Sequence, residues 1–138
     1  MIIGLGHVAY KVKDLDESLE FYCGKLGLKE AFRLNHENGE LMLVYLKVVE
    51  GQFIELFPGG IDKGKDEDER IGFKHLCLHV DDIFATLEEL RKRGLEIKGQ
   101  PMMGADGNYQ YWIEDPDGNR IELMQIMPGS LQDKAKEF

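Results

Sequence analysis

The chain contains an internal repeat, which constrains its fold more than any other feature of the sequence. The segment that starts at His7 has a counterpart at His75, 68 residues later (75 − 7). An Ile-Glu-Leu triplet also occurs near the end of each half, and its glutamates, Glu55 and Glu122, are 67 residues apart (122 − 55). Halves that keep register to within one residue are duplicated structural units. We therefore expect two copies of one small fold.

Each half opens with a strand pattern that leads into a helix pattern. Apolar and less apolar side chains alternate in residues 7–12 and 75–80, as is typical of half-buried strands, and the leading histidine lies on the less apolar face. Asp14 and Asp82 then stand at expected helix N-caps, followed by apolar residues at helical spacing and a terminating glycine. Both halves therefore begin as a strand followed by a helix.

Three further strands complete the predicted β-α-β-β-β order of each half. They are expected at about 29–35, 41–49 and 53–57 in the first half, and at about 95–98, 109–114 and 120–124 in the second. This order predicts the α+β class, with two tandem modules forming a curved mixed sheet around a central metal site. We assign module 1 to 4–58 and module 2 to 73–127 of a single domain, 1–138, with a Gly-rich, charged linker at 59–72.

Composition excludes several classes of partner. Asp and Glu number 26 against 17 Lys and Arg, and the net charge of −9 disfavours binding to a phosphate backbone. No apolar run approaches the roughly 20 residues of a membrane span, and the N-terminal residues lack a secretory signal pattern. Two cysteines make neither a CxxC pair nor a disulfide framework. We therefore expect a cytoplasmic protein that binds neither nucleic acid nor membrane.

A histidine and a glutamate recur at equivalent positions of both halves, which predicts a metal site. His7 and Glu55 lie opposite the apolar face of module 1, and His75 and Glu122 take the same places in module 2. A lone strand histidine is usually structural, but a glutamate between Ile and Leu on a sheet is costly unless it is paired. Two imidazoles and two carboxylates suit one divalent ion of nickel, cobalt, zinc, manganese or iron. Which of these metals binds stays open.

Two other side chains are candidates for contact with a small-molecule substrate. His79 follows His75 by two positions, so strand alternation places it on the same face as the expected metal ligands. Trp112 lies in the strand at 109–114 and has the kind of side chain that lines apolar pockets. The alternatives are a histidine that lines the cavity without touching substrate and an ordinary core or rim tryptophan.

The repeated motifs resemble those of the vicinal oxygen chelate superfamily, which includes glyoxalases, bleomycin-resistance proteins and dioxygenases. The resemblance rests on the duplicated modules, the Gly-His-Val start, the Phe-Ile-Glu-Leu and Arg-Ile-Glu-Leu strands, and the Asp-Pro-Asp-Gly-Asn turn at 115–119. It covers residues 4–127. Within the superfamily, the His/Glu/His/Glu set is most similar to that of glyoxalase I.

The resemblance to glyoxalase I implies a metal-dependent lyase or isomerase. Such an enzyme converts the hemithioacetal of methylglyoxal and a thiol into a lactoyl thioester. An octahedral ion with four protein ligands keeps two adjacent positions for a substrate with adjacent oxygens, and it stabilises the enediolate through which the proton moves. Glu122 is implied as the general base, with Glu55 as its symmetric partner.

Two departures from the glyoxalase I pattern leave the thiol open. Members of that family usually carry Arg four residues after the first histidine, where it binds a glutathione carboxylate. This chain has Lys11, which keeps the charge without the bidentate guanidinium. It also has Gly59 where those members usually carry Asn. Lys11 is thus a candidate substrate-binding residue, and a thiol other than glutathione is possible.

Other functions in the same superfamily remain as alternatives. A small-molecule binding or resistance protein would need no metal, whereas an extradiol dioxygenase or an epimerase would use a different ligand set. Dioxygenases use two histidines and one carboxylate on iron, and a fourth ligand at Glu55 would crowd out oxygen. The expected sheet edges and apolar faces predict a homodimer. The sequence leaves open whether the four ligands come from one chain or from two.

Overall fold

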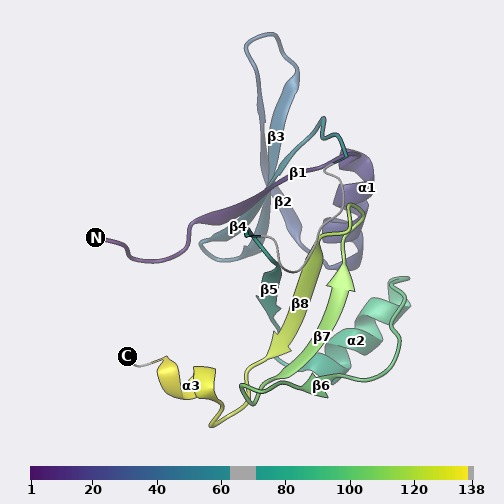
Figure 1. The fold of residues 1–138 in the computed structure, drawn as a ribbon. Coiled ribbons are helices and arrows are strands. Elements are labelled where there is room, and N and C mark those ends of the chain that lie inside the picture. The colour runs from purple at the N-terminus through teal and green to yellow at the C-terminus, as the bar shows by residue number, and fades with distance from the viewer. Residues whose placement is uncertain (63–70, 137–138) are drawn as a thin grey trace. The chain divides into compact units, whose positions relative to one another are not determined.

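Two four-stranded sheets, one in each half of the chain, form the framework of the part that the structure describes (Figure 1). The structure is a computed structural model describing residues 1–62 and 71–136. The chain divides into two units, Met1–Glu67 and Asp68–Phe138, hereafter unit 1 and unit 2. The predicted α+β class and tandem modules are confirmed. The predicted linker at 59–72 falls partly outside the described residues, so the module boundaries stay a prediction.

In unit 1, the first strand pairs with the last. The elements are β1 (His7–Lys11), α1 (Leu15–Leu19), η1 (Glu20–Lys25), β2 (Lys29–Asn35), β3 (Leu41–Val49) and β4 (Gln52–Phe57). The strand order is β1-β4-β3-β2, with β1 parallel to β4 and the other neighbours antiparallel. This pairing sets Ala9 opposite Glu55, and it brings the predicted ligands of this half onto neighbouring strands.

Unit 2 repeats this topology. Its elements are β5 (Leu76–His79), α2 (Ile83–Lys92), β6 (Met102–Met103), β7 (Tyr109–Glu114), β8 (Arg120–Gln125) and α3 (Leu131–Ala135). The order is β5-β8-β7-β6, again with the first strand parallel to the last. Figure 1 shows α2 alongside β7 and β8. No helix of the described residues is long and apolar enough to cross a bilayer.

The last strand of each unit separates a buried apolar face from the face that carries the glutamate. Ile54 and Leu56 are fully buried on either side of Glu55 in the sequence, and Ile121 and Leu123 flank Glu122 in the same way. Burial of each such side chain contributes about 1.5–3 kcal/mol. Strand alternation then directs the glutamate to the opposite face, as the sequence predicts.

The first helix differs from the simple helix that the sequence predicts. Asp14 caps α1 by accepting a hydrogen bond from the Glu17 amide (3.1 Å). After five residues the chain continues as the π-helical segment η1. Phe21 and Tyr22 are both buried, at helical spacing from the buried Ser18. π-helical turns of this kind are rare, and the spacing of apolar residues alone does not predict one.

The strand predicted at 95–98 is wrong. Residues 95–98 form no strand hydrogen bonds. The short strand that pairs with β7 is β6, which lies further along the chain. The Tyr111 hydroxyl accepts a hydrogen bond from the Lys98 amide (2.8 Å) and donates one to the Lys98 carbonyl (2.9 Å). A side chain therefore satisfies the backbone groups that a neighbouring strand would otherwise bind.

Candidate metal centre

The predicted ligands of unit 1 lie side by side. His7 begins β1, and Glu55 stands in the middle of β4, opposite the residue two positions after the histidine. Nε2 of His7 is 3.6 Å from Oε1 of Glu55. The glutamate side chain is 10% exposed and the imidazole 43% exposed, so the carboxylate is largely withdrawn from solvent while the ring edge remains accessible.

Unit 2 reproduces this arrangement. Cys77 pairs with Glu122 across β5 and β8, and His75 precedes Cys77 by two positions. Nε2 of His75 lies 3.3 Å from Oε1 of Glu122, and the side chains are 33% and 15% exposed. The repeat in the sequence thus corresponds to a repeat of the same atom pair in space. The same imidazole nitrogen faces the carboxylate in both units.

The spacing within each pair fits ligation of one cation. Metal–nitrogen and metal–oxygen bonds of about 2.1 Å place adjacent ligand atoms about 3.0 Å apart at a right angle and about 3.4 Å apart at the tetrahedral angle. The observed 3.6 Å and 3.3 Å are close to these values. Nitrogen and carboxylate oxygen are ligands that divalent first-row metals accept. Among the described residues, no three or more His, Cys, Asp or Glu side chains gather into one metal-sized group. Each unit by itself thus offers two such ligands in the part of the chain that the structure describes.

An aromatic cluster surrounds the first pair. The Tyr45 ring lies edge-on to His7, with centroids 5.4 Å apart, and its hydroxyl oxygen is 3.4 Å from His7 Nδ1. Phe32 stacks on Tyr45 at 4.4 Å, and Phe53 meets it edge-on at 5.9 Å. The hydrogen bond with Glu55, together with burial and the carboxylate charge, raises the pKa of Tyr45 above its usual value. Tyr45 thus contacts both candidate ligands of unit 1.

Different side chains surround the second pair. Trp112 lies edge-on to His75, with centroids 4.6 Å apart, and its indole N–H donates to Gln110 Oε1 (3.1 Å). The pKa of the Cys77 thiol is raised to about 12, mainly by burial and next by the negative charge of Glu122. The thiol beside Glu122 is therefore protonated at neutral pH and is a weak hydrogen-bond donor.

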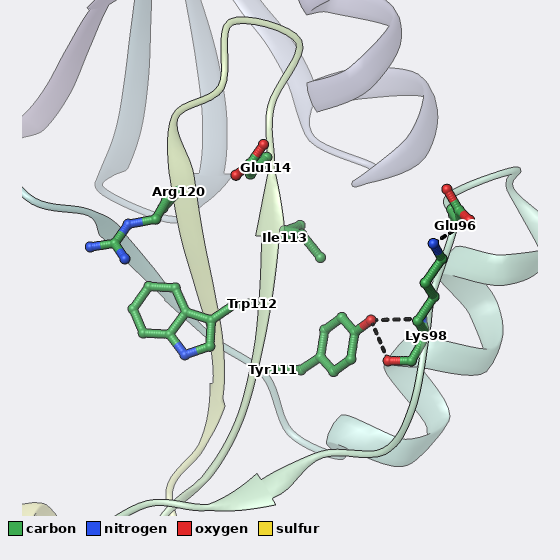
Figure 2. A pocket seen from close by; sticks show the side chains of 7 residues that line it. All are labelled: Glu96, Lys98, Tyr111, Trp112, Ile113, Glu114 and Arg120. Carbon is green, nitrogen blue, oxygen red and sulfur yellow. Dashed lines mark hydrogen bonds and ion pairs between the residues drawn. The ribbon is translucent and has the colours of Figure 1, made fainter. Parts of the chain in front are cut away.

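Trp112, a predicted substrate-binding residue, borders a cavity of about 560 Å³. Figure 2 shows the Trp112 and Arg120 side chains on one side of the strands, with Tyr111 reaching toward Lys98 on the other. The Arg120 guanidinium lies 5.4 Å from the Trp112 ring centroid, a cation–π distance. The face that carries the second His–Glu pair thus also presents a cation on an aromatic surface.

The other two substrate-binding candidates lie at the ends of the strands β1 and β5, away from the leading histidines. Lys11 ends β1 with an exposed side chain, and alternation puts it on the same face as His7. His79 ends β5 and lines a separate cavity of about 530 Å³ with side chains from the C-terminal residues 126–136. Their roles as substrate contacts stay predictions.

Tyr45 and Cys77 are not among the candidates chosen from the sequence, although the repeat contains a signal for one of them. Tyr45 pairs with Glu55 across β3 and β4, and Trp112 pairs with Glu122 across β7 and β8. The two aromatic residues are 67 positions apart (112 − 45), the same offset as the glutamates. Extending the repeat alignment through the third strands identifies Tyr45 as a neighbour of the site.

Comparisons with known proteins agree with the repeated fold. The family model described as Glyoxalase/Bleomycin resistance protein/Dioxygenase superfamily matches residues 4–123. A Synechocystis protein named "Probable lactoylglutathione lyase" is 36% identical over 124 residues, which cover 86% of this chain and 92% of that protein. A Haemophilus influenzae protein named "Lactoylglutathione lyase" is 30% identical over 125 residues, covering 86% and 90%.

A solved structure is also similar. The crystal structure of a glyoxalase family protein from Enterococcus faecalis superposes with a TM-score of 0.72 at 25% identity. The match covers 88% of this chain and 96% of that one. The sequence and structure comparisons therefore agree on the same superfamily.

Proposed function

Because this chain belongs to the glyoxalase/bleomycin resistance protein/dioxygenase superfamily, we propose that it is a metal-dependent lyase of the glyoxalase I type. The proposed reaction converts the hemithioacetal of methylglyoxal and a thiol into a lactoyl thioester. The observation that carries this proposal is the pair of matching His–Glu contacts, 3.6 Å and 3.3 Å long, at equivalent positions of the two units. Relatives named lactoylglutathione lyase support the same reaction.

The proposed ligand set is His7, Glu55, His75 and Glu122, holding one divalent ion of nickel, cobalt, zinc, manganese or iron. Each unit supplies an imidazole nitrogen and a carboxylate oxygen at a spacing suited to adjacent positions on one ion. The two pairs come together either within one chain or between two chains of a dimer. The bound ion would act as a Lewis acid on the adjacent oxygens of the substrate.

Glu122 is the proposed proton carrier. Its carboxylate removes the proton from the carbon that bears sulfur and returns it to the neighbouring carbon, while the hydroxyl and carbonyl oxygens exchange one proton. The reaction is an internal redox rearrangement, so it consumes no oxidant or reductant. The largely withdrawn position of the Glu122 side chain, 15% exposed, supports this role because few water molecules compete with the substrate for its carboxylate.

The thiol cosubstrate is proposed to carry an anionic group, such as a carboxylate or a phosphate, in addition to its sulfur. Lys11 lies on the same strand face as His7 and offers an ammonium group to a carboxylate or phosphate. Trp112 offers an aromatic surface beside His75 for the remainder of the substrate. Glutathione, bacillithiol and coenzyme A are the thiols to compare.

The protein is proposed to act as a cytoplasmic homodimer. Strand β2 is exposed along its whole length at the sheet edge, and Ile2, Ile3 and Leu5 are almost fully exposed. Apolar groups and unpaired strand edges of this kind are usually covered in an assembly. Both cysteines are free thiols, which is consistent with a reducing compartment.

A second candidate function is binding of an aromatic small molecule without turnover. The aromatic cluster of Phe32, Tyr45 and Phe53 supports it, since Phe32 is 44% exposed and offers its ring to a ligand. This candidate predicts binding that does not depend on metal. The lyase predicts thioester formation that does.

A panel assay separates these functions. The metal-loaded protein is incubated with methylglyoxal and each of the three thiols, and thioester formation is followed by its ultraviolet absorbance. We expect turnover with at least one thiol and its loss after chelation. No turnover with any thiol, combined with metal-independent binding of an aromatic compound, would support the binding function and reject the lyase.

A further inference from the structure

The two candidate ligand pairs are alike, but the side chains that support them are not. We infer that Tyr45 is a positioning residue that fixes both candidate ligands of unit 1, His7 and Glu55, through its single hydroxyl group. This inference rests on the proposed function, because it concerns the same metal centre. Under this inference, the ligands from unit 1 are the ones that are held in fixed positions.

The contacts of the Tyr45 hydroxyl carry the inference. Its oxygen lies 3.4 Å from Nδ1 of His7, while Nε2 of the same ring faces Glu55 at 3.6 Å. Tyr45 also pairs directly with Glu55 across the antiparallel strands β3 and β4, so their side chains share one face. One hydroxyl group therefore reaches the two side chains that come from β1 and β4.

The protons are consistent in only one arrangement. An imidazole that binds a metal through Nε2 carries its proton on Nδ1 and donates it to an outer acceptor, which fixes the ring. With a metal ion on Nε2 of His7, the Tyr45 oxygen, 3.4 Å from Nδ1, is placed to be that acceptor. Its own proton then remains available for the Glu55 carboxylate, its cross-strand neighbour on the same face. The chain of bonds runs from His7 through Tyr45 to Glu55.

Neighbouring rings hold Tyr45 in this orientation. Phe32 stacks on it with an interplanar angle of 18°, and Phe53 meets it at 62°. Aromatic pairs of this geometry contribute about 0.5–1.5 kcal/mol each beyond their buried area. The hydroxyl position is therefore fixed by packing that does not involve the ligands themselves.

Unit 2 has a different residue at the equivalent position. Trp112 pairs with Glu122 as Tyr45 pairs with Glu55, but an indole has no acceptor for a proton from His75. Its N–H donates to Gln110. The group beside Glu122 is instead the Cys77 thiol, where unit 1 has the methyl group of Ala9. Glu122 thus receives a weaker donor than Glu55 does, as suits a carboxylate that moves to carry a proton.

The variant Tyr45→Phe tests the inference by removing one oxygen and keeping the ring. We expect the affinity for Co²⁺, titrated into the metal-free protein by calorimetry, to fall about 10- to 100-fold, the usual effect of losing an outer-shell partner. Tyr111→Phe is the matched control. It removes a hydroxyl that bonds only to the Lys98 backbone, on the opposite face of β7, and we expect Co²⁺ affinity within about twofold of wild type.

Nitrogen-15 NMR of the zinc-loaded protein gives a readout that needs no turnover. With Nε2 of His7 on the ion, we expect its Nδ1–H to exchange slowly with water in the wild type, because Tyr45 accepts its hydrogen bond, and faster in Tyr45→Phe. A wild-type His7 Nδ1–H that exchanges as fast as an exposed imidazole N–H would overturn the inference even if the variant does not fold. Unchanged Co²⁺ affinity in a folded Tyr45→Phe protein would overturn it as well.

Failure of the lyase proposal is a separate result. If no thiol supports turnover, the exchange rate of the His7 Nδ1–H and the Co²⁺ affinities still decide whether Tyr45 positions the two side chains. Conversely, turnover can be present while Tyr45→Phe leaves both readouts unchanged. In that case the lyase stands and the role of Tyr45 is rejected.

Discussion

The two halves of this chain carry the same donor atoms in different surroundings. Unit 1 places a tyrosine hydroxyl against His7 and Glu55 and surrounds it with phenylalanines. Unit 2 places an indole edge against His75 and a protonated thiol beside Glu122. Duplication therefore preserved the donor set while the neighbours diverged. In such a protein, symmetry identifies candidate ligands, and asymmetry indicates how their roles divide.

Turnover is where the halves should differ most. We expect Glu122→Gln to lower kcat by about 10³-fold, within the range of about 10²–10⁴ that a positioned general base contributes. Glu55→Gln, assayed at saturating Co²⁺, should lower kcat by only about 10-fold because it removes a fixed ligand. Steady-state kinetics of both variants measure the ratio. Equal losses would show that the two carboxylates share the base role.

Metal retention, in contrast, should respond equally to either half. We expect His7→Ala and His75→Ala each to weaken Co²⁺ binding by more than about 100-fold, the upper end of the effect of losing an outer-shell partner. Elemental analysis after dialysis measures bound metal per chain. A variant that keeps the wild-type metal content would exclude its histidine from the ligand set.

Alkylation should separate the cysteines of the two halves. With a pKa of about 12, only about one Cys77 thiol in 10⁴ is ionised at pH 8, so Cys77 should react slowly with iodoacetamide. In the metal-free Glu122→Gln protein, loss of the carboxylate charge lowers this pKa, raises the thiolate fraction and speeds alkylation about 10-fold. Mass spectrometry follows both sites, with Cys23 as an internal reference. An unchanged Cys77 rate would show that Glu122 does not affect the thiol.

The smallest expected effects concern the two helix caps, which should be alike. Asp14 accepts a hydrogen bond from the Glu17 amide (3.1 Å) and Asp82 from the Ala85 amide (3.0 Å). We expect Asp14→Ala and Asp82→Ala each to lower the free energy of unfolding by about 1 kcal/mol. Urea denaturation measures both. A cap whose removal costs nothing would mean that its helix start is held by tertiary contacts instead.

Short-range patterns in the repeat predicted most strands and the sheet face on which each histidine and glutamate lies, whereas the role of these residues as metal ligands stays a prediction. The strands at 29–35, 41–49 and 109–114 occur with the predicted bounds. Each predicted His–Glu pair forms because the first and last strands of a module are neighbours. Alternation alone then placed these side chains on the face opposite the core.

Two of the misses depend on contacts between residues that are far apart in the sequence. The segment at 95–98 has the pattern of a strand, but the Tyr111 hydroxyl hydrogen-bonds the Lys98 amide and carbonyl in place of a neighbouring strand. The π-helical segment Glu20–Lys25 was missed because apolar spacing does not distinguish it from an α-helix. The position of Tyr45 beside both ligands depends on cross-strand register, which a single strand pattern does not contain.

The parallel pairing of each module's first strand with its last has a consequence for biosynthesis. A histidine near the start of a half meets its glutamate only after the strand that closes the half has been made and has docked. During translation the nascent chain thus exposes His7 well before it can form a chelating pair, and the second pair is completed only when β8 leaves the ribosome. A partial chain that ends before β8 can therefore offer at most one of the two proposed ligand pairs to a cation.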